Sequence, residues 1–195
     1  MLSLIGGRGH YESVVKAAMA AERTLWIATA NLKELMVEDE RAKPGQRRTL
    51  KHQGAYRSVL KTFEEQVEKG LEIRLLHASP PSQPFRAELS KCRGLKKSAR
   101  GSFELRMCPR VHVKMVIIDS AQLYLGSANW TGAGLGAKGE GRRNFELGLM
   151  SQDDLLLDEA QAYFDRIWQG DPCGSCKLRD RCPKPLDSQS IRQRG

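Results

Sequence analysis

The sequence predicts an α/β fold in one principal domain, residues 1–170, followed by a cysteine-containing tail, residues 171–195. Two observations predict this fold class. Helical and strand-like patterns alternate twice in the first half of the chain, and four strand-like runs lie close together in the second half. A length of 195 residues suits a single hydrophobic core, and 40% hydrophobic with 28% charged residues excludes a disordered chain.

The first half contains two pairs of a helix and a strand. Apolar residues at helical spacing predict a helix over 11–22, and the run 24–29 is rich in residues that favour strands. Helical spacing returns between Val59 and Val67, and Gly70 is a suitable end for that helix. A second strand is therefore predicted at 71–76.

Two further segments are predicted to be exposed basic loops. Residues 41–52 contain a Pro-Gly pair and five Lys or Arg with no acid. Residues 79–101 contain three prolines and six Lys or Arg against the single acid Glu88, and we interpret them as a long loop with one helical turn at most.

The second half is dominated by strands and ends in a helix. Strands are predicted at 103–107, 111–118, 122–125 and 145–150. Ser151 with Asp154 resembles a capping box, and the apolar positions from Leu156 to Trp168 predict a final helix that packs on the sheet. No internal repeat is visible.

The charge of the chain indicates an anionic partner. A formal net charge of +9 and an isoelectric point near 9.5 favour nucleic acid first and an anionic phospholipid surface second. No segment approaches the roughly 20 apolar residues that cross a bilayer, so we expect a cytoplasmic protein without a transmembrane segment. In that compartment the five cysteines are predicted to be thiols or metal ligands rather than disulfides.

One segment carries the chemistry. Residues 112–129 read HVKMVIIDSAQLYLGSAN and fit the pattern H-x-K-x4-D-x6-G-S-x-N. On a strand, His112 and Lys114 project from one face, so an imidazole and an ammonium share one pocket. Ser127 and Asn129 supply compact hydrogen-bond donors that suit a phosphate oxygen.

This pattern resembles the signature of the phospholipase D superfamily at every fixed position. The resemblance implies a mixed β-sheet flanked by helices, one motif in each chain, and phosphodiester chemistry without a metal. A neutral histidine would attack phosphorus, while a second histidine would protonate the leaving oxygen and later activate water. Lys114 and Asn129 would hold the phosphate oxygens, and Ser127 would add a hydrogen bond.

Two carboxylates complete the set that the resemblance implies. Asp119 would support the site by hydrogen bonding within it rather than by proton transfer, which is a structural and electrostatic role. Asn144-Phe145-Glu146 matches the strand that presents a carboxylate to the catalytic imidazole in many members of the superfamily, so Glu146 is the expected partner that orients His112.

The histidine count predicts a homodimer. The mechanism needs two histidines, and the other three, His10, His52 and His77, lack the accompanying Lys, Asp and Asn. One chain is therefore half of a site, and the resemblance implies that a two-fold dimer brings two copies of His112 together.

The tail predicts a metal clamp. Cys173, Cys176 and Cys182 follow the spacing C-x2-C-x5-C-P, which resembles the C-terminal part of the iron–sulfur clamp in RecB-type exonucleases. Zinc and an iron–sulfur cluster each need about four ligands, so Cys108 or Cys92 must supply the fourth. We expect Cys108, which follows a predicted strand; the alternative is a tail of unliganded, reactive thiols.

Three functions remain open at this level. The first is a homodimeric, metal-independent nuclease, with the two basic loops flanking its site. The second is a phospholipase D-type lipid hydrolase, although a lipid substrate would favour an exposed apolar loop that the sequence does not show. The third is a non-catalytic module that binds nucleic acid on the same fold.

Overall fold

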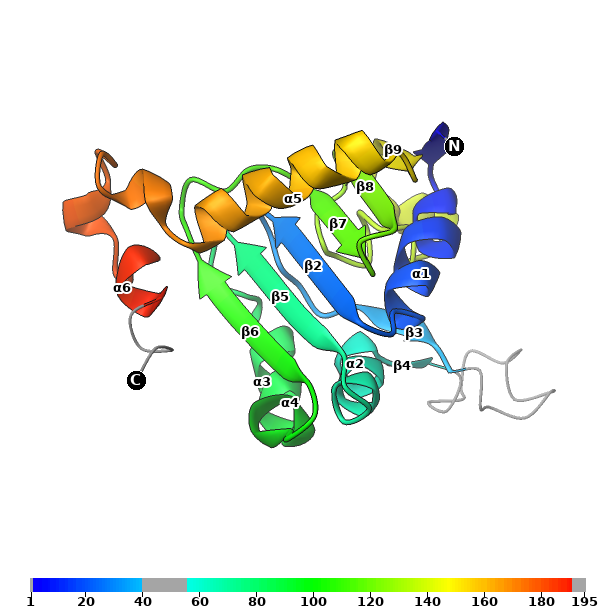
Figure 1. The fold of residues 1–195 in the computed structure, drawn as a ribbon. Coiled ribbons are helices and arrows are strands. Elements are labelled where there is room, and N and C mark those ends of the chain that lie inside the picture. The colour runs from blue at the N-terminus through cyan, green and yellow to red at the C-terminus, as the bar shows by residue number, and fades with distance from the viewer. Residues whose placement is uncertain (1, 40–55, 191–195) are drawn as a thin grey trace.

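The protein is described by a computed structural model that covers residues 2–39 and 56–190. Its centre is a seven-stranded sheet in the order β1-β9-β8-β7-β2-β5-β6 (Figure 1). The strands are β1 (Leu2–Gly6), β2 (Thr24–Thr29), β5 (Glu72–His77), β6 (Ser102–Met107), β7 (Met115–Ile118), β8 (Gln122–Gly126) and β9 (Leu147–Ser151). Because β2, β5 and β6 run parallel while the other pairs are antiparallel, the sheet is mixed and the predicted fold class is confirmed. A separate pair, β3 (Met36–Glu38) and β4 (Tyr56–Ser58), lies at its side.

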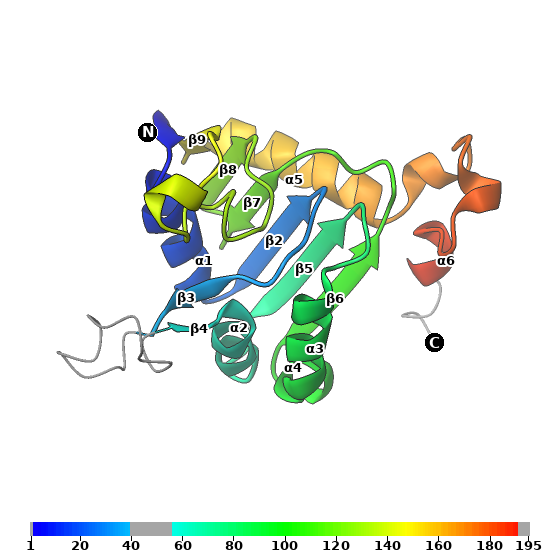
Figure 2. The ribbon, with the colours of Figure 1, turned by 180° about the vertical axis from the view of Figure 1, so that it is seen from behind.

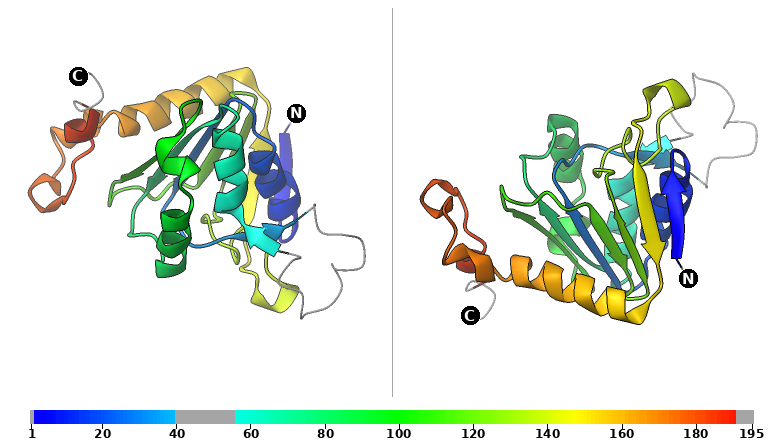
Figure 3. Two further views of the ribbon diagram at one scale, coloured as in Figure 1. Left: turned by 90° about the horizontal axis from the view of Figure 1, so that it is seen from below. Right: turned by 90° about the horizontal axis from the view of Figure 1, so that it is seen from above.

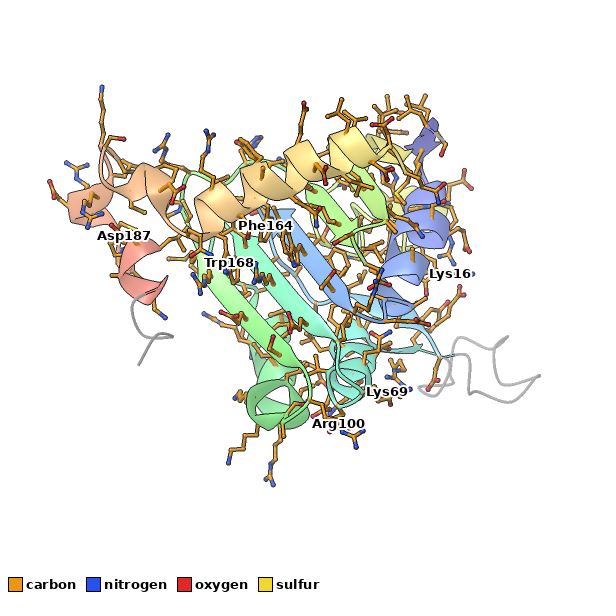
Figure 4. The ribbon with its side chains drawn as sticks, viewed as in Figure 1. Lys16, Lys69, Arg100, Phe164, Trp168 and Asp187 are labelled. Atoms are coloured by element: carbon orange, nitrogen blue, oxygen red, sulfur yellow. The ribbon has the colours of Figure 1, made fainter. Side chains whose placement is uncertain are left out.

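Helices cover both faces of the sheet. One face packs against η1 (His10–Val15), α1 (Lys16–Met19), α2 (Val59–Val67), α3 (Gln83–Lys91) and α4 (Gly94–Lys97), all on the near side in Figure 2. The other face packs against α5 (Asp154–Trp168), so the sheet lies between two helical layers (Figure 3). Asp153 caps α5 by accepting a hydrogen bond from the Leu156 amide, and Phe164 and Trp168 point from α5 toward the sheet (Figure 4).

Strand register brings distant segments to one end of the sheet. Thr29 lies opposite His77 in the parallel pair of β2 and β5, and Ala28 lies opposite Met115 in the antiparallel pair of β2 and β7. The carboxyl ends of β2, β5 and β8 therefore meet the beginnings of β7 and β9. We call this end of the sheet the site edge.

The prediction of a long loop at 79–101 is wrong, because the segment forms α3 and α4. Ser82 caps α3 by accepting a hydrogen bond from the Phe85 amide at 3.4 Å, and the buried side chains of Phe85 and Leu95 anchor the two helices. These helices form the crossover that parallel β5 and β6 require. Arg100, which follows α4, lies with Lys69 at the end of the sheet away from the site edge (Figure 4). The other predicted basic loop, residues 41–52, lies outside the described residues.

The tail follows α5 beyond the β6 side of the sheet (Figure 1). It contains the short turns η3 (Asp171–Cys173), η4 (Arg179–Arg181) and α6 (Asp187–Ser190). Gly170 begins the tail in the left-handed region with φ +84°, and a side chain there would also meet the Asp187 amide nitrogen at 2.2 Å. In the residues that the structure describes, no helix is long and apolar enough to pass through a membrane.

Candidate active site

His112 and Lys114 lie together in the extended segment that leads into β7. The Lys114 ammonium donates to the His112 carbonyl at 2.8 Å and lies 3.3 and 3.4 Å from the two ring nitrogens. The two ring nitrogens point in different directions within the ring plane, so one group cannot lie along both lone pairs. An ammonium at nearly equal distances from both nitrogens therefore lies over the face of the ring. The exposed imidazole thus keeps both nitrogens available in its own plane, beside a positive charge that is almost fully buried.

Asn129 is held at the end of β2. Its side-chain oxygen accepts from the Asn31 amide at 2.9 Å and from the Thr29 hydroxyl at 3.3 Å. The same hydroxyl accepts from the Trp130 amide at 2.9 Å. Because the oxygen end of the amide is engaged by the protein, its NH2 end is the one that can donate to a phosphate.

Ser127 and Glu146 form a second pair at the site edge. The Ser127 hydroxyl donates to the Glu146 carboxylate, and it accepts from the Leu147 amide at 3.1 Å. Asn144 donates its side-chain NH2 to the other Glu146 oxygen at 3.1 Å. The structure therefore places Ser127 as a partner of Glu146, whereas no bond joins His112 to Glu146 among the described residues. The expected role of Glu146 as the orienter of His112 stays a prediction.

Asp119 lies apart from these residues, at the other end of β7. Its carboxylate accepts hydrogen bonds from the backbone amides of Glu22, Arg23 and Thr24 at 2.7–3.2 Å. Partial burial opposes ionisation, but these three amides lower the pKa of Asp119 overall. Four strand residues separate Asp119 from Lys114, so the expectation that it hydrogen-bonds within the site is not met: it ties the end of β7 to the start of β2.

Comparison with known proteins agrees with this geometry. A family model described as cardiolipin synthase, phospholipase D-like domain, matches residues 48–168, more than half of the chain. The chain belongs to the phospholipase D superfamily. The resemblance inferred from residues 112–129 is thereby confirmed. No curated protein sequence matches the chain.

Solved structures show the same superfamily fold at low sequence identity. NucT from Helicobacter pylori is 14% identical with a TM-score of 0.56, and the alignment covers 85% of this chain and 94% of that one. The phospholipase D family member Nuc from Salmonella typhimurium is 13% identical with a TM-score of 0.56, covering 87% and 95% of the two chains. A phosphatidylserine synthase from Haemophilus influenzae Rd KW20 is 18% identical with a TM-score of 0.53, covering 86% of this chain and 38% of that one.

Two buried aromatic groups behind Glu146 were not found from the sequence. The Tyr124 ring occupies the space that side chains at Gly126 and Gly148 would need, since Cβ atoms there would meet it at 2.4 and 2.3 Å. Burial raises the pKa of Tyr124 to about 12. The His10 ring meets the Tyr124 ring edge-on with 5.6 Å between centroids, and burial lowers the pKa of His10 while the Glu146 charge acts against that shift.

His77 also lies at the site edge, at the end of β5, and the sequence did not predict this position. Its Nδ1 lies 2.8 Å from the Ser79 carbonyl, which fixes Nδ1 as the protonated nitrogen. Burial lowers the pKa of His77, which favours the neutral ring. Thr29, Asn31 and His77 all come from strand ends far from the motif in sequence, and only the register of β2, β5 and β7 brings them to it.

The predicted cysteine ligands also converge. Cys108, Cys173, Cys176 and Cys182 line one small cavity between the segment after β6 and the tail. Cys92 is instead buried in the core under α2, α3 and α4, where burial raises its pKa to about 11. Within residues 2–39 and 56–190, the structure shows no group of three or more Cys, His, Asp or Glu side chains in an arrangement that could hold a metal ion.

Proposed function

We propose that the protein is a homodimeric, metal-independent phosphodiesterase that cleaves nucleic acid through a phosphohistidine intermediate on His112. The observation that carries the proposal is that His112, which lies beside Lys114, is the one exposed imidazole among the residues that the structure describes. Among the described histidines, His10 is 0% and His77 is 4% exposed, so neither is open to a substrate from this chain. The second imidazole that the reaction needs would come from another copy.

The geometry supports the following reaction. A neutral ring nitrogen of His112 attacks phosphorus, a P–N bond forms, and the P–O bond to the leaving group breaks. The partner subunit's His112, protonated, gives its proton to the leaving oxygen. It then takes a proton from water as the water oxygen attacks phosphorus and the P–N bond breaks. Lys114 and the NH2 of Asn129 stabilise the charge on the remaining phosphate oxygens.

An uncovered apolar surface beside the site supports the dimer. Leu4, Leu125, Leu147 and Leu149 project from the α5 side of the sheet, and we call them the leucine face. Leu4, Leu147 and Leu149 are 67%, 56% and 42% exposed, and register places Leu4 and Leu125 on either side of Leu149. In the view from above, β9 and β1 stand clear of α5 (Figure 3). Contiguous exposed leucines of this kind mark interaction sites, and Leu147 directly follows Glu146, so a second copy on this face would bring its own site edge nearby.

Unpaired basic residues near the site support a nucleic-acid substrate. Lys33 follows Asn31 by two residues and its amide bonds the Trp130 carbonyl at 3.0 Å, while Arg142 and Arg143 precede Asn144. None of these three side chains has an acidic partner among the described residues. With the net charge of +9, they provide positive charge where a phosphate backbone would approach His112.

A phospholipid substrate is the second candidate. The specific observation in its favour is Phe145, which is fully exposed next to Glu146 and could insert into lipid. A protein that shares the fold is, by its name, a phosphatidylserine synthase, so the fold is compatible with phospholipid chemistry. The expected cytoplasmic location stays a prediction under either candidate.

One comparison separates the candidates. Wild type, His112→Ala and the control Lys69→Ala, at an exposed position far from the site edge, are incubated in EDTA with labelled DNA, RNA and a phosphatidyl lipid. We expect cleavage of nucleic acid by wild type and Lys69→Ala, and none by His112→Ala. Lipid cleavage with the same dependence on His112 would establish the second candidate, and binding without cleavage by all three proteins would indicate a non-catalytic module. Circular dichroism in EDTA shows that any lost activity is not unfolding.

A further inference from the structure

The described part of the tail buries little apolar surface. Residues 171–190 form only short helical turns, and among residues 171–188 Leu186 is the one fully buried apolar side chain, which joins the core under α5. An ion pair between Arg179 and Asp187 at 2.6 Å adds little, because both side chains are partly exposed, at 43% and 34%. A segment with this little buried surface commonly relies on a covalent or metal cross-link.

Four thiols are gathered where such a cross-link would lie. Cys108 is fixed after β6 because its amide donates to the His77 carbonyl at 2.9 Å and its carbonyl accepts from the Val111 amide at 3.0 Å. Cys173, Cys176 and Cys182 of the tail line the same cavity as Cys108, and all four are free thiols. Two segments more than 60 residues apart in the chain therefore contribute sulfur to one place.

Arg110 adds a positive charge at the same place. It lines the cavity together with Cys108 and the three tail cysteines. A guanidinium there would offset part of the negative charge that four thiolates bring together.

We propose that Cys108, Cys173, Cys176 and Cys182 bind one metal centre as four thiolates, either zinc or an iron–sulfur cluster. Four cysteine sulfurs form a complete ligand set for either centre, and here they line one cavity. In the structure the thiols line the cavity without yet being arranged to hold an ion, so loading draws the tail toward Cys108. The centre would be structural, because it cross-links the tail to the segment that begins four residues before His112. The proposal does not depend on the phosphodiesterase activity.

The test measures metal directly in the full-length protein. Wild type is purified without oxygen and analysed for metal content and visible absorption, beside Cys108→Ser, Cys176→Ser and the control Cys92→Ala. We expect either about one zinc in a colourless protein or about four irons in a brown one. Both ligand variants should lose the metal and Cys92→Ala should keep it. A metal-free wild type, or metal that survives in Cys108→Ser and Cys176→Ser, would overturn the proposal.

A second measurement uses wild type alone, in case a variant does not fold. Native protein is treated with a thiol-alkylating reagent before and after chelation or oxidative removal of the metal, and the modified cysteines are counted by mass spectrometry. We expect the four cavity cysteines to become modified only after the metal is removed, with Cys92 protected in both states because it is buried in the core. Rapid alkylation of the four cysteines before removal would contradict a metal centre.

Discussion

Asp119 gives the sharpest test of how the motif is used, because the structure assigns it to folding rather than to the site. Three backbone amides at the start of β2 donate to its carboxylate, and its own amide donates to the Thr24 carbonyl at 2.8 Å. Its backbone also has φ +53°, a conformation that Asp, Asn and Gly tolerate better than other residues. Asp119 therefore fastens the end of β7 to the start of β2.

Two substitutions separate the contributions. Asp119→Asn keeps one carbonyl acceptor and tolerates the left-handed backbone, so we expect a loss of about 1 kcal/mol in the free energy of unfolding. Asp119→Ala leaves three amides without their acceptor and adds backbone strain, and we expect a loss of roughly 2–4 kcal/mol. The carboxylate is partly exposed, so water replaces some of these bonds and keeps the loss below the sum of three charged hydrogen bonds.

The pH dependence follows from the lowered pKa of Asp119. A carboxylate with a lower pKa in the folded state than its ordinary value of 3.8 stabilises the protein above that value. The contribution is lost as the pH falls through the lowered folded-state pKa. The stability difference between wild type and Asp119→Asn should therefore be constant near neutrality and shrink in acid.

Urea denaturation followed by tryptophan fluorescence measures these differences, and turnover is measured on the folded fraction. We expect Asp119→Asn to turn over at a rate close to that of wild type despite its lower stability. A variant with the stability of wild type and no turnover would refute this reasoning, because it would place Asp119 in the chemistry.

Three other predictions follow from the site and the sheet. When equal amounts of wild type and His112→Ala are mixed and re-equilibrated, we expect about a quarter of the activity shown by the same total amount of wild type, because only dimers with two intact histidines react. Half of that activity would mean that each chain is a complete site. Leu149→Glu on the leucine face should give a monomer without activity in sedimentation and cleavage assays, whereas Met36→Glu, an equally exposed position on β3, should leave the dimer intact. Gly148→Ala should lower the free energy of unfolding by about 1–3 kcal/mol, since its Cβ would lie 2.3 Å from the Tyr124 ring, and unchanged urea denaturation would argue against that packing.

Much of the fold was predictable because its elements are encoded locally. Apolar spacing was enough to locate α2 and α5 together with β2, β5 and β9, but it did not reveal the short strand β4 before α2. The failure at 79–101 has a physical cause: the segment is rich in proline and basic residues, and only a few apolar side chains, led by Phe85 and Leu95, hold α3 and α4 against the core. Proline at the second position of α3 is compatible with a helix start, which its composition alone does not reveal.

The site was predictable to the extent that the motif is contiguous. His112, Lys114, Ser127 and Asn129 come together because β7 and β8 form a hairpin that returns the chain to its starting edge. The same geometry explains Asp119, since four residues of strand at about 3.3 Å each carry it to the far end of β7. Thr29 and Asn31 escape sequence reasoning because they reach Asn129 only across the β2–β7 pair, about 100 residues away in the chain.

The two sides of His112 are supported in different ways. On the β7 side, the backbone of Lys114 is tied into the sheet by the Gly126 amide at 3.2 Å, and its side chain reaches back to the His112 carbonyl. On the other side, Cys108 lies four residues before His112. Its amide donates to the His77 carbonyl, and its side chain lines the cavity that the tail cysteines also line. In the proposed dimer an exposed imidazole would need both supports, because each chain would contribute its own positional error to the shared site. A cross-linked tail at Cys108 would therefore add to the support that β5 gives this segment through the His77 carbonyl.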